Sequence, residues 1–460
     1  MRETKETTEN HLLHAPILPA IAKLALPIMA TGFVQMAYNL TDMAWIGFLG
    51  PNSVAAVGAA GMFTWLAQGV MNISKMGGQV LTGQSLGAGN ERDAKGYVRA
   101  ALQIAVALAL CYAAICLVFA EELIGFFRFT GADTAREGVV YLRIAGGCIL
   151  FSFLVQTMTG IYTASGDSRT PFLANCIGLF GNMFFDPVLI FGIGPFPKLG
   201  VAGAALATVS AQFVVMSVLF LMRKRRRAVV FMDNPLRARA ERLQYRKIFR
   251  IGFPASIQTT VYCMISMVLT RMVSSFGDTA VAIQRVGSQI ESIGWMTGEG
   301  FAAAVNAFMA QNYGAGNLER IKKGYGVSVF LMVIWGAFAS CVLYFGAEPL
   351  FSLFIHEPSM IPDGVTFMHI LSYGEIPMCL ELMTVGALCG LGLTGLSSVI
   401  SMTLTGARIP IALILTGTAL GLNGIWWAFV LSSITKGIVF TIAFLLVLRR
   451  LLRRGRPASC

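Results

Sequence analysis

The sequence predicts an all-α membrane protein with twelve transmembrane helices in two six-helix bundles. Three observations lead to this prediction. Hydrophobic residues make up 56% of the 460 residues and charged residues only 13%, about half the roughly 25% of a soluble domain. The apolar runs are long and continuous, which favours helices over the two-residue alternation of a membrane β-barrel. The second half of the chain also repeats motifs of the first.

The apolar runs set the number of spans. One span takes about 20 apolar residues, so the hydrophobic share of this chain would fill about twelve. Turn residues and charges that interrupt the runs mark the edges of each span. In chain order, the expected spans cover residues 17–46, 54–80, 98–120, 139–163, 172–193, 201–222, 248–275, 280–310, 325–346, 364–390, 397–418 and 424–448.

These spans divide the chain into four parts. We expect residues 1–222 to form an N-terminal six-helix lobe and residues 248–448 a C-terminal six-helix lobe. A basic linker, 223–247, joins the lobes, and a basic tail, 449–460, follows them. Because the number of spans is even, both termini lie on the same side of the membrane.

Charge bias predicts which side that is. The connections on the side of the termini hold 23 Lys and Arg residues, and the opposite connections hold three. Lys and Arg accumulate on the cytoplasmic side, so we expect cytoplasmic termini in a multi-pass protein of the plasma membrane, a bacterial inner membrane. The Arg223–Arg227 run, RKRRR, could bind nucleic acid, but a topology anchor on anionic lipid is the favoured interpretation.

The two halves share motifs in a common register. Gln84–Asn90 reads QSLGAGN, and 227 positions later Gln311–Asn317 reads QNYGAGN. Pro27 and Pro254 are separated by the same offset. Further glycines match at offsets of 227 or 226, namely Gly50 with Gly277, Gly160 with Gly386 and Gly166 with Gly392.

This register indicates an internal duplication. Each half has six spans, so the halves share one orientation and are expected to be related by a pseudo-two-fold axis along the membrane normal. Such an architecture is typical of a transporter in which two bundles rock around a cavity. A channel or a membrane enzyme has no particular need of it.

Two acids inside expected spans are candidates for function. A charge at mid-bilayer costs about 2.5–3.5 kcal/mol on insertion scales, so intramembrane acids are rarely incidental. In the first span, Gln35, Tyr38 and Asp42 fall at i, i+3 and i+7, on one helix face. In the fifth span, Asn175 and Asn182 precede Asp186 by eleven and four residues, again on one face.

These side chains suit a coupling ion. Two carboxylates that face a dry cavity repel each other and lose solvation, so the pair either takes a proton or binds a monovalent cation. Asn182 would add an amide oxygen and Thr208, in the sixth span, a hydroxyl. The same oxygens serve Na⁺ and H⁺, so the sequence leaves the ion open. Asn182 and Thr208 could instead only hydrogen-bond one helix to another.

A second polar site is predicted less sharply. Glu375 and Glu381 in the tenth span, with Lys436 in the twelfth, could form a buried ion pair or a second functional site, and a structural pair is favoured. Glu291 and Arg285 in the eighth span could brace the bundle from its inner face. The nine cysteines show no metal-ligand spacing.

At these residues the chain resembles a known family. The paired QxxGAGN turns, Tyr38–Asp42 (YNLTD), Ser165–Pro171 (SGDSRTP) and Asn182–Pro187 (NMFFDP) resemble the MATE family of multidrug and toxic-compound extrusion transporters. The resemblance extends from about residue 17 to 448 and is closest to the DinF-like or MepA-like bacterial branches. NorM-like members also have a seventh-span acid, where this chain has Gln258 and Tyr262.

The resemblance implies a set of functional residues. A sodium ion or proton would involve Asp42, Asn182, Asp186 and Thr208, and the substrate would lie nearby, with Gln35, Tyr38 and Asn175 as its candidate ligands. The resemblance further implies a monomeric, cation-coupled antiporter, with no cofactor beyond Na⁺ or H⁺, that exports organic cations or amphipathic drugs. Its partners would be small molecules and membrane lipids, without nucleic acid.

Two alternative functions remain open. A flippase for lipid-linked precursors or polysaccharides belongs to the same superfamily, but would favour a larger basic cavity. A membrane-embedded enzyme belongs to a different class, and the sequence has no His-rich cluster, nucleophile–His pair or metal spacing to support it.

Overall fold

The computed structural model describes residues 11–129, 131–226, 239–355 and 357–454. In these ranges every regular element is a helix, which confirms the predicted all-α fold. Residues 227–238 and 455–460 lie outside the described ranges, so about half of the predicted linker and half of the predicted tail are not described.

Among the described residues of the first half, seven helices are long and two are short. Most end at the glycines and charged residues that bound the apolar runs. The helices are α2 (His11–His14), α3 (Ile17–Gly47), α4 (Pro51–Gly87), α5 (Glu91–Val118), α6 (Ala120–Gly125), α7 (Ala132–Gly147), α8 (Leu150–Ala164), α9 (Arg169–Phe191) and α10 (Val201–Arg226).

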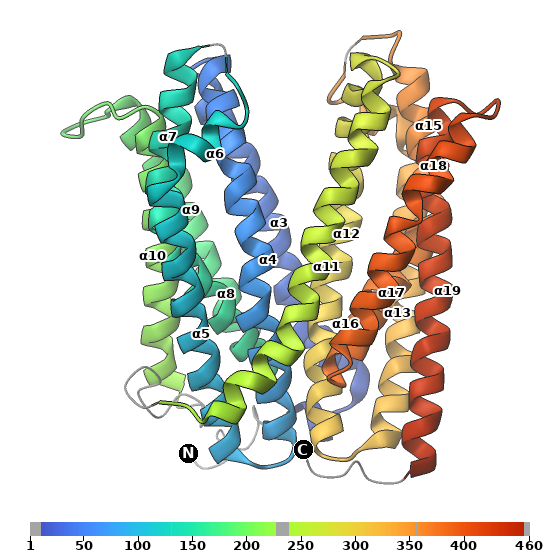
Figure 1. Ribbon diagram of the computed structural model, residues 1–460. Coiled ribbons are helices and arrows are strands. Elements are labelled where there is room, and N and C mark those ends of the chain that lie inside the picture. The colour runs from blue at the N-terminus through green and yellow to red at the C-terminus, as the bar shows by residue number, and fades with distance from the viewer. Residues whose placement is uncertain (1–10, 130, 227–238, 356, 455–460) are drawn as a thin grey trace. The chain divides into compact units, whose positions relative to one another are not determined.

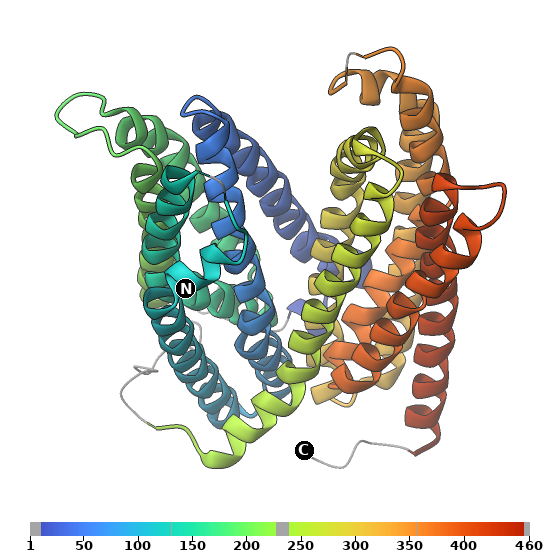
Figure 2. The ribbon, with the colours of Figure 1, turned by 45° about the horizontal axis from the view of Figure 1, so that its top comes forward.

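The second half repeats this order. Its helices are α11 (Arg242–Ser274), α12 (Asp278–Gly314), α13 (Leu318–Phe345), α14 (Ala347–Ser352), α15 (Ile361–Ser372), α16 (Glu375–Gly390), α17 (Thr394–Gly406), α18 (Arg408–Thr416) and α19 (Leu422–Arg454). Figure 1 labels most of them, and Figure 2 shows the same ribbon after rotation.

Not every span is a single apolar helix. Among the described residues, nine helices or near-continuous helix pairs are long and apolar enough to cross a membrane, and α7 with α8, bent by 45°, makes a tenth. The two remaining spans of the predicted twelve are α12 and the α15–α16 pair. They carry Glu291, Glu375 and Glu381, so the spans with the weakest apolar signal are those that carry the acids of the second half.

Matched glycines confirm that the halves share one backbone design. Gly89 and Gly316 follow α4 and α12 with φ values of 70° and 72°. Gly166 and Gly392 have φ values of 80° and 81°. Positive φ is accessible to glycine without strain, so the repeated glycines are explained by repeated turns.

The chain packs as two units, and each takes the start of its first span from the other half of the sequence. Unit 1 contains Ala30–Ser256, and unit 2 contains Leu12–Met29 with the chain from Ile257 onward. The changes of unit fall two residues after Pro27 in α3 and two residues after Pro254 in α11. The packing units therefore follow the duplication, except at the starts of two helices. The start of α3 belongs to unit 2, and the start of α11 belongs to unit 1.

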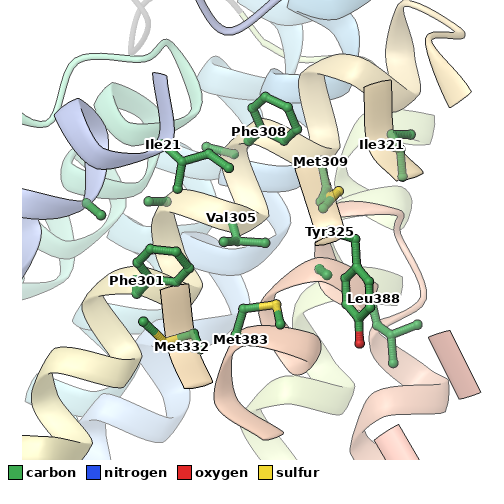
Figure 3. Packing of buried hydrophobic residues seen from close by; sticks show 14 of the residues in the cluster. Ile21, Phe301, Val305, Phe308, Met309, Ile321, Tyr325, Met332, Met383 and Leu388 are labelled. Atoms are coloured by element: carbon green, nitrogen blue, oxygen red, sulfur yellow. The ribbon is translucent and has the colours of Figure 1, made fainter. Parts of the chain in front are cut away.

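The core of unit 2 holds the exchanged start of α3. Figure 3 shows Ile21 of α3 among side chains of α12, α13 and α16, including Phe308 and Met383, and these three residues are fully buried. Arg320 donates hydrogen bonds to the backbone carbonyls of Leu12 and Ala15. These contacts hold the chain before and within the first turns of α3 to unit 2.

Candidate functional site

The predicted ion-binding residues meet inside unit 1. Asn182 and Asp186 are fully buried and lie on the buried face of α9. The Asn182 Nδ2 atom donates a hydrogen bond to Asp186 Oδ1 at 3.0 Å. From α3, the Tyr38 hydroxyl contacts Thr208 Oγ1 of α10 at 3.2 Å, and Asp42 interacts with the Asp186 carboxyl. The structure thus brings together all four residues of the predicted ion site, and Tyr38 with them.

Small residues allow the helices to approach each other here. Gly178 lies one turn before Asn182 on the same face of α9. A Cβ atom at this position would lie 3.1 Å from the backbone carbonyl oxygen of Ala211 in α10. Close backbone approach through small residues is the usual basis of helix packing in membranes, and it places Thr208, one turn before Ala211, beside α9.

Three side-chain oxygens in this cluster are buried without a hydrogen-bond partner among the described residues. They are Asp42 Oδ1, Asn182 Oδ1 and Asp186 Oδ2. Buried polar atoms are normally satisfied, and a buried carboxylate requires a compensating charge. The two carboxylates also repel each other when both are ionised, so a proton or another positive charge would stabilise the cluster. Carboxylate and amide oxygens of this kind suit either a bound proton or a monovalent cation.

Tyr141 of α7 belongs to the same cluster and was not predicted. It is 7% exposed, and its hydroxyl interacts with Thr208. The Thr208 hydroxyl therefore lies between two tyrosines, from α3 and α7. A single tyrosine in an apolar run cannot be told from a core residue by sequence, so no pattern indicated this one.

Two predicted substrate residues do not join the cluster. Gln35 donates to Asn39 Oδ1 on the same helix at 3.1 Å. Asn175 donates to the Pro171 carbonyl on its own helix at 2.8 Å. Both are half-buried. They stay predictions as substrate ligands, and only Tyr38 of that set contacts the ion-binding residues.

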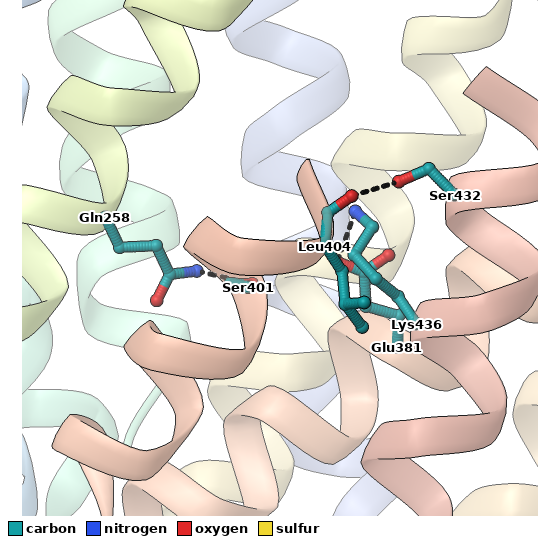
Figure 4. A network of polar contacts seen from close by, with 6 residues as sticks. All are labelled: Gln258, Glu381, Ser401, Leu404, Ser432 and Lys436. Carbon is teal, nitrogen blue, oxygen red and sulfur yellow. Dashed lines mark hydrogen bonds and ion pairs between the residues drawn. The ribbon is translucent and has the colours of Figure 1, made fainter. Parts of the chain in front are cut away.

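The second polar site is divided into two parts. In unit 2, Lys436 Nζ of α19 donates to Glu381 Oε1 of α16 at 2.7 Å, and the two side chains are 5% and 8% exposed. Figure 4 shows this ion pair, together with the 3.1 Å hydrogen bond from Gln258 to Ser401. Glu375 does not join the pair: it is 1% exposed, and both its carboxylate oxygens lack a partner in the described part of the chain.

Arg408 is a second residue that was not predicted, and it is charged. It lies within the expected span 397–418, is 7% exposed, and its guanidinium is 5.3 Å from the centre of the Phe429 ring. Arg408 also acts electrostatically on Glu291 of α12. The signal that could have found it is the one that singled out Lys436 and Arg285, a cation inside an expected span.

The repeated QxxGAGN turns are structural. After the Gly89 turn, Asn90 caps α5 by accepting a hydrogen bond from the backbone N–H of Asp93 at 3.1 Å. In the SGDSRTP motif, Asp167 accepts from the backbone N–H of Thr170 at 3.1 Å. Side-chain capping of this kind satisfies free N–H groups at a helix start. These motifs therefore have a structural role at the starts of helices.

Comparison with known proteins identifies the family. The MatE family model matches residues 27–188 and 254–414, one match in each half. The chain belongs to the MatE family. The two matches begin at the matched prolines Pro27 and Pro254 and end in the fifth and eleventh expected spans, so they follow the register of the sequence repeat. The resemblance to MATE transporters is thereby confirmed for both halves.

Relatives of this MatE protein match it over most of its length. The probable multidrug resistance protein NorM of Thermotoga maritima is 26% identical over 437 residues, 92% of this chain and 91% of the relative. The FAD transporter of Shewanella oneidensis is 27% identical over 357 residues, 76% of this chain and 77% of the relative.

Solved structures show the same fold. An outward-facing multidrug resistance MATE family transporter of the MOP superfamily has a TM-score of 0.90 at 22% identity, over 97% of this chain and 99% of that one. A MATE structure in complex with MaD3S has a TM-score of 0.89 at 22% identity. This MatE protein therefore has the fold of MATE transporters, with twelve helices in two bundles.

Proposed function

We propose that this MatE protein is a cation-coupled antiporter that exports small organic cations or amphipathic compounds in exchange for Na⁺ or H⁺. One observation carries the proposal: Asp42, Asn182 and Asp186 each direct a buried, unpartnered oxygen into one cluster of the described chain. Two neighbouring carboxylates that each have one buried oxygen without a partner among the described residues require a cation from outside the chain. A purely structural polar contact would have its hydrogen bonds satisfied.

Ion binding in this cluster acts on the first span. Asp42 is on α3 and Asp186 on α9, so a proton or Na⁺ between them neutralises their repulsion and draws the two helices together. Tyr38, one turn before Asp42, bonds to α10 through Thr208. Gln35 lies on the same face, so substrate bound there would be sensitive to the position of α3. A coupling ion can drive export only through such a difference in affinity between two states.

One similarity favours a second substrate class. The FAD transporter of Shewanella oneidensis covers about three quarters of this chain at 27% identity. A flavin nucleotide is anionic and aromatic, in contrast to an organic cation such as ethidium. We therefore include FAD beside ethidium in the test, in proteoliposomes that hold one compound at a time.

The test separates the coupling ion from the substrate. Purified protein in proteoliposomes is given an imposed Na⁺ gradient or, separately, a pH gradient, and compound movement is measured. We expect one of the two gradients to drive transport. Asp42→Asn and Asp186→Asn should abolish this transport while membrane insertion stays normal, because the amide keeps the volume but removes the charge. Asp133→Asn, an exposed acid in the first turn of α7, is the matched control and should transport like wild type.

Two results would contradict the proposal. Wild-type transport rates in Asp42→Asn or Asp186→Asn at equal reconstitution would show that the cluster does not couple an ion. Compound movement that ignores both gradients in the wild type would show that the protein is not an antiporter of either ion.

A further inference from the structure

The start of α11 buries one of its faces against unit 1. On this face Gln244 is 7% exposed and Ile248 is fully buried. An added Cβ atom at Gly77 of α4 would lie 2.6 Å from the Ile248 carbonyl oxygen, and Gln244 fills the space beside Gly96 of α5. Figures 1 and 2 show this helix start beside the end of α4 and the start of α5. Packing thus fixes which face of α11 stays exposed.

The exposed face carries three arginines and two aromatic rings. Arg242, Arg246 and Arg250 follow one another at intervals of four residues, so they form one stripe along the helix. All three are exposed. Phe249 and Phe253 lie on the same face, farther along the helix, and are 40% and 52% exposed. The face therefore changes from cationic to apolar in the direction of the membrane span.

The spacing of charges along α11 gives the depth of this face. Arg250 is separated from the next charged residue, Arg271, by 20 uncharged residues. A helix of about 20 residues is about 30 Å long, the thickness of the hydrocarbon core. Arg250 therefore lies at the edge of the core, and Arg246 lies about 6 Å farther out, within a headgroup layer that is about 5–7 Å thick. This edge is on the side where charge bias predicts the cytoplasm.

The three arginines have no counter-charge within the described chain. No ion pair there joins any of them to an acid. Residues 239–250 contain five basic residues and one acid, Glu241, a net charge of +4. The linker segment 227–238 contains two arginines and one aspartate, so it adds positive charge. The anions that balance this face must therefore come from its surroundings.

The repeat shows that the fold does not need these arginines. At the offset of 227, their counterparts at the start of α3 are Ala15, Pro19 and Lys23. That helix start is held by Arg320, which donates hydrogen bonds to the backbone carbonyls of Leu12 and Ala15. The same helix start thus forms with one basic residue in place of three.

We propose that the start of α11 is a binding site for anionic phospholipids, with Arg242, Arg246 and Arg250 on the headgroup phosphates and Phe249 and Phe253 against the acyl chains. A guanidinium donates two parallel hydrogen bonds to a phosphate, which favours arginine over lysine here. Basic clusters beside a membrane helix attract the anionic lipids of the cytoplasmic leaflet. A nucleic acid would also be attracted to the arginines, but it has no group that matches two rings at the depth of the acyl chains.

The test measures lipid binding and involves no transport. Full-length protein on an affinity resin is equilibrated with mixed micelles that contain radiolabelled phosphatidylglycerol, and the retained lipid is counted against its mole fraction. Phosphatidylcholine with the same acyl chains is the control for the headgroup. We expect saturable binding of phosphatidylglycerol that is tighter than that of phosphatidylcholine and that weakens as NaCl is added.

Two triple variants locate the site. Arg242→Gln/Arg246→Gln/Arg250→Gln should weaken phosphatidylglycerol binding roughly 100-fold, because each arginine near an anionic surface contributes about five-fold. The matched control changes three exposed arginines at the end of α19 and should keep wild-type affinity; it is Arg449→Gln/Arg450→Gln/Arg453→Gln. Either variant leaves 20 Lys and Arg residues against three across the membrane, so insertion should stay normal.

Four results would overturn the inference. Equal binding of the two lipids would remove the role of the headgroup, and equal losses in the two triple variants would mean that only net charge matters. Displacement of the lipid by inorganic phosphate, but not by chloride at the same ionic strength, would indicate a site for free anions. Tighter binding of a single-stranded DNA oligonucleotide than of phosphatidylglycerol would indicate a nucleic-acid site.

A single substitution keeps the inference testable if the triple variant does not fold. Arg246→Gln removes the central charge of the stripe and should weaken phosphatidylglycerol binding about five-fold. Arg450→Gln in α19 is its matched control and should leave the binding unchanged. Wild-type affinity in Arg246→Gln would contradict the assignment of the site to α11.

Discussion

The buried ion pair between Glu381 and Lys436 should be far more important for stability than an ion pair on the surface. The two side chains are 8% and 5% exposed and their charged atoms are 2.7 Å apart, so neither solvent nor salt screens the pair. Removing one partner of such a pair costs about 3–5 kcal/mol, because the other charge stays buried and alone. Insertion scales give a similar cost of about 2.5–3.5 kcal/mol for one uncompensated charge in a span.

The perturbation is a double-mutant cycle of Glu381→Gln and Lys436→Met. We expect each single change to reduce the free energy of unfolding by about 3 kcal/mol or more. The double variant should lose less than either single one, because it buries no charge. Arg143 and Glu121 offer a matched control, since they form an ion pair at 2.9 Å with side chains 45% and 72% exposed. Glu121→Gln should cost less than about 1 kcal/mol.

The assay is equilibrium unfolding in mixed micelles, with each variant compared at the same lipid and detergent composition. The coupling energy of the cycle isolates the pair from other effects of the two substitutions. A Glu381→Gln variant as stable as Glu121→Gln would refute the reasoning, because it would mean that water reaches the pair. A double variant less stable than both single variants would refute it as well.

Two further predictions concern the ion site and the repeat. Tyr141→Phe removes one hydroxyl that contacts Thr208, so the ion concentration for half-maximal transport should rise by the equivalent of about 0.5–1.5 kcal/mol, measured in proteoliposomes. Gly89→Ala and Gly316→Ala should each lower the free energy of unfolding by about 1 kcal/mol, because both positions have left-handed backbone. Gly326→Ala, in the helix α13 with open space around its Cβ position, is their control and should be neutral or stabilising. Unequal losses at Gly89 and Gly316 would contradict the equivalence of the two turns.

The sequence was sufficient for the helices and for the acids that meet in the cluster of unit 1. The sixth span, predicted as 201–222, agrees with the apolar span Val201–Met222 of α10. Such spans are predictable because a continuous apolar run must lie in lipid or protein, and glycines and charges end it. Asp42 and Asp186 were predictable because an acid inside an apolar span is costly, whether the span faces lipid or protein, and is therefore rarely incidental.

Breaks within spans and contacts between distant helices were not predictable in the same way. α7 and α8 were expected as one span, 139–163, but the chain bends by 45° between them. α17 and α18 meet at Ala407, next to Arg408; Pro410 cannot donate to the carbonyl of Gly406, which explains the interruption. The electrostatic effect of Arg408 on Glu291 joins helices far apart in the sequence, and spacing along one helix contains no information about that.

Ion coupling should depend on unit 1 alone. The double variant Glu381→Gln/Lys436→Met in unit 2 tests this without leaving a buried charge unpaired. Leu269 and Ala412 are the apolar counterparts of the two ion-site acids and lie in a hydrophobic cluster, so they cannot bind a cation. Glu381 is neutralised by Lys436 within the chain. We therefore expect Glu381→Gln with Lys436→Met to retain substantial ion-driven efflux in vesicles, while Asp42→Asn loses it at equal reconstitution. Glu381→Gln alone is a poorer test, because the buried lysine it leaves would reduce folding and efflux together. The folded double variant could instead be as inactive as Asp42→Asn. Ion coupling would then also depend on residues of unit 2, even though Leu269 and Ala412 are apolar there.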